Sequence, residues 1–144
     1  MSRPCFFLLY LLVLTSNSTS MNSTFTTLLR SVLGATLLVF GFNKFFAFIP
    51  MFDMPPAAAN FMESLENTGY VLSVVAILEI IIGLLLLFKK WVPFALVILA
   101  PITLNILLFH IFLDVSDIYV AIVMFALNVI LIYKYWKAFR TLFQ

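Results

Sequence analysis

Glu79 lies in the middle of an apolar run, Tyr70 to Phe88, that is long enough to cross a lipid bilayer as a helix. A carboxylate near the centre of a bilayer costs about 3 kcal/mol even on the most permissive insertion scale. Residues of this kind usually face a partner or a cavity inside the protein rather than lipid. The sequence therefore predicts a membrane protein with a polar position built into its interior.

The composition agrees with a membrane location. Of 144 residues, 65% are hydrophobic and 10% are charged, whereas soluble domains carry about 25% charged residues. A lipid bilayer is the expected surroundings, and the length allows one small helical bundle without a separate soluble domain. The few basic residues are scattered among apolar runs, which gives no support to nucleic-acid binding. Cys5 is the single cysteine, so no intramolecular disulfide or Cys-x-x-Cys redox pair can form.

The first twenty residues differ from the rest. An apolar stretch, Cys5 to Leu14, precedes a Ser/Thr/Asn run that ends at Ser20, and together they resemble a weak secretory signal. The alternative is that residues 1–20 are an upstream extension and that translation starts at Met21. A cleaved signal would place the new N-terminus outside and invert every span. We therefore expect a start at Met21, with residues 21–144 forming the membrane domain.

The remaining chain reads as four spanning helices. Pro50 closes the first span, and Pro93 suits the first turn of the third. The fold class expected is all-α, a membrane four-helix bundle with a short interfacial helix between helices 1 and 2. The expected spans are about 25–49, 70–88, 93–113 and 118–136, with the interfacial helix over about 57–67.

Charged residues sort to opposite helix ends. One set of ends carries the basic residues Arg30, Lys89, Lys90, Lys134, Lys137 and Arg140. The other set carries the acidic residues Asp53, Glu63, Glu66, Asp114 and Asp117. Lys and Arg near helix ends favour the cytoplasmic side of a membrane. We therefore expect both termini to be cytoplasmic.

Polar residues inside the spans all fall between the midplane and the acidic ends. The candidate site residues are Asn43 and Lys44 in the first span, Glu79 in the second, Asn105 and His110 in the third, and Asn128 in the fourth. A polar pocket open toward the acidic side is the simplest explanation. The alternative is that the asparagines are hydrogen-bonding contacts between helices, at about 0.6 kcal/mol each.

Two of these positions allow more than one interpretation. Lys44 can reach Glu79 and form an ion pair, or it can extend to the membrane surface. His110 lies four residues before Asp114, so the two can meet on one helix face. His110 is then either an interfacial histidine held by that contact, or a proton carrier and hydrogen-bond partner of a quinone carbonyl. The spacing of His110, Glu79 and Asp114 does not support a metal site.

Pro101 and two glycines predict how helices meet. Gly34 and Gly41 lie seven residues apart on one face of the first span and allow close approach of another helix. Pro101 is expected to kink the third span and to turn Asn105 toward the bundle interior.

An ordered set of short motifs resembles the DoxX family of small four-helix membrane proteins, over about Leu28 to Trp136. The matching stretches are Leu33-Gly34, Phe40 to Phe46, Met54 to Ala58, Leu78-Glu79, Gly83 to Leu85, Leu99 to Pro101, Asn105 and Phe109-His110. The resemblance implies a multi-pass protein of a bacterial inner (cytoplasmic) membrane. The family name comes from a membrane subunit of a quinone-linked thiosulfate oxidoreductase, and other members are associated with oxidative-stress complexes. Lys44, Glu79, Asn105 and His110 carry over as positions of the family pattern.

The leading functional hypothesis is the membrane subunit of a quinone-linked redox system. His110 and Asn105 would hydrogen-bond the carbonyls of a bound quinone, the cofactor that this hypothesis requires, while Glu79, paired with Lys44, would relay a proton. The sequence does not otherwise identify a cofactor. One alternative is a non-enzymatic assembly or anchoring subunit with protein partners or further copies of itself. Another is a small proton-coupled carrier, which the lack of an inverted repeat disfavours.

Overall fold

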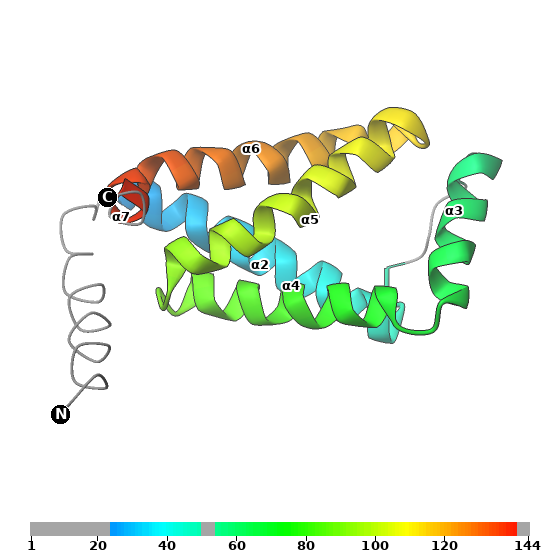
Figure 1. The fold of residues 1–144 in the computed structure, drawn as a ribbon, viewed down its shortest axis with the longest axis horizontal. Coiled ribbons are helices and arrows are strands. Elements are labelled where there is room, and N and C mark those ends of the chain that lie inside the picture. Colours follow the sequence, from blue (N-terminus) through cyan, green and yellow to red (C-terminus); the bar gives the residue numbers. More distant parts are fainter. Residues whose placement is uncertain (1–23, 50–53, 141–144) are drawn as a thin grey trace, which may run out of the picture.

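The chain folds entirely into helices over the residues described by a computed structural model, 24–49 and 54–140 (Figure 1). This part of the chain contains no strand. The elements are α2 (Thr24–Phe46), α3 (Pro56–Asn67), α4 (Val71–Leu87), α5 (Val92–Phe112), the 3-10 turn η2 (Val115–Asp117), α6 (Ile118–Lys134) and α7 (Trp136–Arg140). The predicted all-α fold class is confirmed. The expectations for residues 1–20 lie outside the described residues.

Long apolar helices make this a multi-pass membrane protein. Three segments are each long and apolar enough to cross a bilayer: α2, α5, and η2 together with α6. A fourth candidate span is the pair of α3 and α4, which are bent by 89° at the break between them. The 17 residues of α4 alone lie at the short end of the usual range for a spanning helix.

The first span ends earlier than the sequence predicted. Helix α2 stops at Phe46 rather than Ile49, because Ala47 adopts a left-handed backbone conformation with φ of 48°. The side chain of Asn43 stabilises this end, since its Oδ1 accepts a hydrogen bond of 2.6 Å from the backbone N–H of Ile49. Asn43 was expected in a polar pocket, but the structure uses its amide to cap a helix end.

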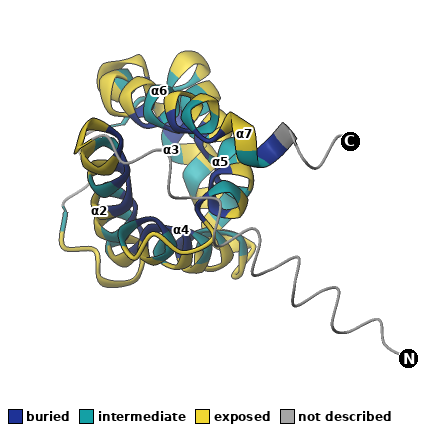
Figure 2. Cartoon of the chain, turned by 90° about the vertical axis from the view of Figure 1, so that its left-hand side faces the viewer, coloured by how far each residue is buried: buried dark blue, intermediate teal, exposed yellow. Residues whose placement is uncertain are grey.

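The four long helices pack as two close pairs, α2 with α4 and α5 with α6. Viewed from the end where α2 begins, their buried faces surround a common axis (Figure 2). Helices α4 and α5 share a turn at one end of the bundle and diverge toward the other end (Figure 1). Helix α3 lies across that open end.

Three glycines explain the closeness of α2 and α4. A Cβ built on Gly34 would lie 3.0 Å from the carbonyl oxygen of Gly83, and one on Gly41 would lie 2.8 Å from Cγ1 of Ile80. Any larger residue would push these backbones apart, so the predicted close approach at Gly34 and Gly41 is confirmed. Gly83 is the partner of Gly34 on α4.

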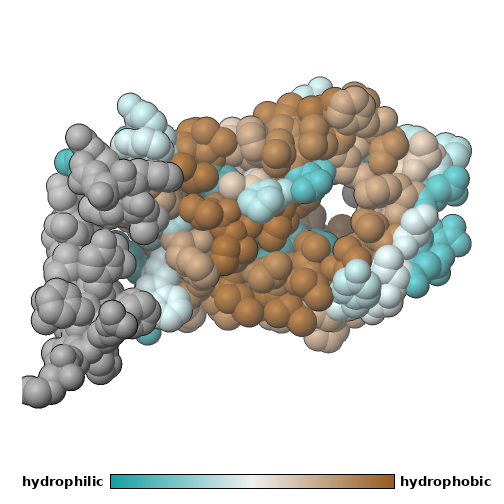
Figure 3. Space-filling view, viewed as in Figure 1, coloured by the Kyte–Doolittle hydropathy of each residue, from teal (hydrophilic) through white to brown (hydrophobic). Residues whose placement is uncertain are grey.

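Apolar side chains fill the interior and also cover the outside. The buried core consists of Leu33, Leu37, Ile82, Leu86, Val92, Ala95, Leu96, Leu99, Met124, Leu131, Tyr135 and Phe139. The surface between the two ends of the bundle is also mostly hydrophobic (Figure 3). A soluble protein rarely exposes so large an apolar surface, and this one is suited to contact with lipid.

The charged ends predicted from the sequence are present. What we call the basic end carries Arg30, Lys89, Lys90, Lys134 and Lys137, around the start of α2, the α4–α5 turn and the end of α6. What we call the acidic end carries Glu63, Glu66, Asp114 and Asp117, on α3 and around η2. Asp53 and the side chain of Arg140 lie outside the described residues. The cytoplasmic location of the basic end stays a prediction.

Candidate functional site

Lys44 and Glu79 form an ion pair between α2 and α4. The Nζ of Lys44 lies 2.7 Å from the Oε2 of Glu79 and donates a hydrogen bond to it. The side chain of Glu79 is 1% exposed and that of Lys44 is 25% exposed. Of the two interpretations of Lys44, the ion pair is therefore confirmed.

The glycine packing of α2 brings this pair together. A Cβ on Gly41 would lie 3.3 Å from the Cβ of Glu79, so Glu79 stands directly against the α2 backbone. Lys44 follows Gly41 by three residues and therefore projects from the same face of α2. The long lysine side chain can then reach back to the carboxylate, because the two helices are close enough at this level.

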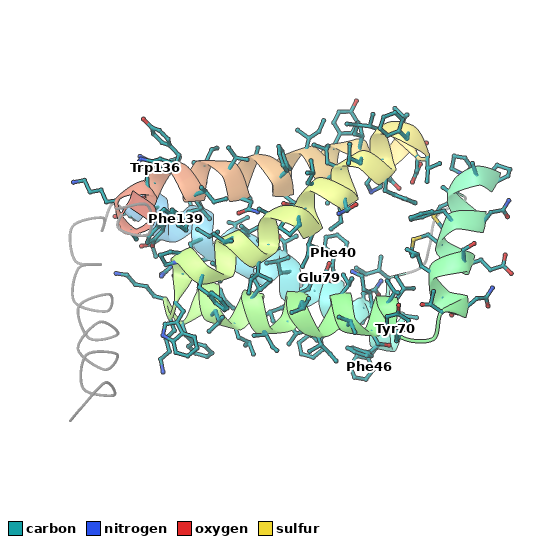
Figure 4. The ribbon with its side chains drawn as sticks, viewed as in Figure 1. Phe40, Phe46, Tyr70, Glu79, Trp136 and Phe139 are labelled. Atoms are coloured by element: carbon teal, nitrogen blue, oxygen red, sulfur yellow. The ribbon has the colours of Figure 1, made fainter. Side chains whose placement is uncertain are left out.

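The contact with Lys44 provides a hydrogen-bond partner for only one of the two oxygens of the Glu79 carboxylate. Its Oε1 is buried and has no hydrogen-bond partner, and a buried polar atom without a partner costs about 1–3 kcal/mol. Glu79 and the half-buried Phe40 both point into the space between α4 and α5 (Figure 4). The site thus offers one free acceptor position on the carboxylate, beside an ammonium group.

The acidic end of the bundle is open near this site. Helix α3 reaches from α4 to α5, where the rings of Phe61 and Phe109 pack with centroids 5.7 Å apart. Between these helices the space-filling view has an opening beside α3 through which the background is visible (Figure 3). In this view the helices are therefore not packed together at this end.

Asn105 does not face the interior, so that expectation is wrong. Its side chain is exposed, and its Nδ2 donates a hydrogen bond of 2.9 Å to the carbonyl of Pro101 in the same helix. The reason is the position of Asn105 around the axis of α5. Pro101 is itself exposed, and a residue four positions later lies on the same helix face. The inward positions on this part of α5 are Leu99 and Thr103.

Asn128 makes a buried contact between α6 and α5. Both ends of its amide are satisfied when Oδ1 accepts hydrogen bonds of 3.1 Å from the N–H of Ala100 and from Oγ1 of Thr103, and Nδ2 donates to the carbonyl of Leu96 at 3.3 Å. This contact lies between the helices of the second pair, not at the Lys44–Glu79 ion pair. It corresponds to the interhelical hydrogen bonding that the sequence offered as an alternative.

His110 is held at the end of α5 by Asp114. The Nδ1 of His110 lies 3.0 Å from the backbone oxygen of Asp114 and 3.7 Å from its Oδ2. The predicted meeting of the two residues is confirmed. This end of α5 is the part that has diverged from α4 (Figure 1). The structure therefore does not bring His110 to Glu79.

Apart from Lys44 and Glu79, the sequence-predicted site residues thus occupy separate places, and three buried polar residues, Thr26, Arg30 and Thr103, were missed. Thr103 packs in the α5–α6 contact, and Arg30 is buried at the basic end. No sequence signal marks them as buried: Thr103 follows Leu96 and Leu99 on one face of α5, but α5 is apolar all round and has no distinct inward face in the sequence. Arg30 likewise shares a face of α2 with buried leucines.

An apolar groove of about 250 Å³ lies between α2 and α6. None of the predicted site residues lines it; its walls are formed by Val32, Thr36, Tyr119, Val120, Val123, Met124 and Leu127. Among residues 24–49 and 54–140, no group of three His, Cys, Asp or Glu side chains comes together as a metal site.

Comparison with known protein families shows which family the chain belongs to. The DoxX model matches residues 25–111, which is more than half of the chain. The chain belongs to the DoxX family. Within this DoxX region lie α2, α3, α4 and nearly all of α5, and so both members of the Lys44–Glu79 pair. No curated protein and no solved structure matches the chain.

Proposed function

We propose that this DoxX-family protein is the membrane subunit of a quinone-linked redox system and that the quinone head group binds at the Lys44–Glu79 pair. The observation that carries the proposal is the buried, unpartnered Oε1 of Glu79 beside the Lys44 ammonium. A quinone ring is apolar and bears carbonyl oxygens that accept hydrogen bonds from a donor such as Lys44. Its reduced form, the quinol, bears hydroxyl groups that donate to an acceptor such as Oε1 of Glu79. A carboxyl group, an ammonium donor and the ring of Phe40 match these properties.

The pair has the chemistry to move a proton to the reduced ring. Reduction of a quinone to a quinol consumes two electrons and two protons, and the electrons would come from a redox centre in a partner protein. Lys44 would donate a hydrogen bond to one carbonyl oxygen, and Glu79 would pass the first proton to that oxygen. The second proton would reach the other carbonyl oxygen from water. Because Lys44 is 25% exposed, it can link Glu79 to water at the acidic end. A positioned acid of this kind is the usual means of proton transfer in enzymes.

His110 and Asn105 have no part in this version of the site. Asp114 holds the ring of His110, and the amide of Asn105 bonds to its own helix. The proposed quinone site therefore consists of the Lys44–Glu79 ion pair, without hydrogen bonds from His110 or Asn105 of α5. We also propose that the basic end faces the cytoplasm in a bacterial inner membrane, because basic residues favour that side.

The test is extraction of quinone from protein purified in mild detergent. Wild type is compared with Glu79→Gln, and Glu66→Gln on the exposed face of α3 is the matched control. We expect stoichiometric quinone in the wild type and in the control, and none in a correctly folded Glu79→Gln protein. Lack of quinone in the wild type, or full retention in Glu79→Gln, contradicts the proposal.

A second candidate is a non-enzymatic assembly or anchoring subunit. The observation in its favour is that α3 presents the exposed carboxylates of Glu63 and Glu66 beyond the bundle, on a helix bent by 89° from α4. Such an acidic surface suits a partner with basic groups, and the ion pair would then serve to fix helix register. In this case Glu79→Gln lowers the amount of complex recovered by co-purification, and no form of the protein carries quinone.

A further inference from the structure

Arg30 places a charged side chain inside the basic end of the bundle. It lies on the inward stripe of α2, three residues before Leu33 and seven before Leu37, and all three are buried. The residue is 5% exposed. Arginine is almost never this deeply buried in proteins unless it is paired.

The guanidinium of Arg30 has unmet hydrogen-bonding capacity. Its Nε and Nη1 are buried and have no hydrogen-bond partner. The carboxylates of the described residues lie elsewhere: Glu79 pairs with Lys44, and the other four are at the acidic end. Arg30 therefore has no counter-ion within the described part of the chain. A buried cation that lacks a counter-ion and has unpartnered N–H groups is energetically costly. A bound anion would remove that cost.

The surroundings of Arg30 favour an anion that arrives from the membrane surface. The exposed lysines Lys89, Lys90 and Lys137 crowd the same end and give it a positive potential. Trp136 is exposed there, while Phe139 of the same short helix is buried, so this end carries one aromatic side chain at the surface and one in the core (Figure 4). Aromatic and basic residues together are typical of the headgroup level of a bilayer.

We propose that Arg30 binds a phosphate group at the basic end of the bundle, and that the phosphate belongs to an anionic phospholipid. The unpartnered N–H groups of Nε and Nη1 can each donate a charge-assisted hydrogen bond to a phosphate oxygen. The nearby lysines add long-range attraction, and Arg30 supplies the specific contact. This site is independent of the quinone proposal, because it involves neither Lys44 nor Glu79.

The test measures lipid binding by native mass spectrometry on delipidated full-length protein. The probes are phosphatidylglycerol and phosphatidylcholine with identical acyl chains. The variants are Arg30→Gln, Arg30→Lys and the control Lys90→Gln, which removes one exposed charge from the same end. We expect wild type to bind phosphatidylglycerol about tenfold more tightly than phosphatidylcholine, which corresponds to a difference in binding free energy of about 1.4 kcal/mol. Lys90→Gln should keep most of this preference, and Arg30→Gln should lose it.

A parallel measurement separates lipid from soluble phosphate. Inorganic phosphate at millimolar concentration is added, and the midpoint of thermal unfolding is recorded. One outcome is that phosphate raises the unfolding midpoint of wild type but not that of Arg30→Lys, while wild type shows no lipid preference. That result assigns the phosphate site to a soluble ligand and contradicts the lipid proposal. Wild type with neither lipid preference nor a response to phosphate overturns the proposal. That result needs no variant, so it stands even where Arg30→Gln fails to fold.

Discussion

The carbonyl oxygen of Gly34 occupies the space that a side chain on Gly83 would need: a Cβ built on Gly83 would lie 2.9 Å from it. This contact holds the backbones of α2 and α4 against each other at the level below the ion pair. Two turns along α2, Gly41 repeats the contact against Glu79. The position of the charged pair is therefore a consequence of glycine packing.

Gly83→Ala should destabilise the bundle by about 1–3 kcal/mol, the usual cost of overpacking a tight interface. The reason is that the obstructing atom is backbone and cannot rotate away. The free energy of unfolding in detergent micelles measures the effect, and Ala35→Val on the exposed face of α2 is the control. If Gly83→Ala were no less stable than this control, the close packing described for α2 and α4 would be wrong.

Removing Lys44 should cost more stability than neutralising Glu79. Lys44→Met leaves a buried carboxylate without its partner, and breaking such a pair typically costs about 3 kcal/mol. Glu79→Gln keeps the shape and leaves only the partly exposed lysine, so its cost should be smaller. The double variant should regain much of the loss, because no buried charge is left unpaired. Additive single effects in this double-mutant cycle would show that the two side chains do not interact.

Asn128→Leu should cost about 1 kcal/mol of unfolding free energy, and it should leave any quinone content unchanged. The asparagine amide bonds across the α5–α6 interface to Ala100 and Thr103, away from the ion pair. Hydrogen bonds between membrane helices are generally worth this little. Loss of quinone from a stable Asn128→Leu protein would instead extend the functional site into α6.

His110→Ala should affect the end of α5 and not the ion pair. It removes the contact between the imidazole Nδ1 and the Asp114 backbone, a loss of about 1 kcal/mol. Amide hydrogen exchange around residues 109–114 should accelerate, while quinone extraction matches wild type. A fall in quinone with unchanged exchange would restore His110 to the binding site.

Most of the fold could be predicted from the sequence because a bilayer permits few solutions. A spanning helix needs about 20 apolar residues, and its backbone must satisfy its own hydrogen bonds. The apolar runs therefore located α2, α4, α5 and α6, and the charges placed their ends. The Lys44–Glu79 pair was one of two arrangements that the sequence allowed, because the rise per residue puts both side chains within mutual reach.

Which face of each helix points inward was decided only by the tertiary structure. Spanning helices such as α5 are apolar all round, so no amphipathic pattern reveals the buried stripe. This is why Asn105 was assigned to the interior, whereas Thr103 lies there. For the same reason the sequence did not distinguish the buried Arg30 from the exposed basic residues at the same end of the bundle. The sequence by itself determined where the long apolar helices lie and which polar residues they contain, and helix packing alone decided which of those residues meet.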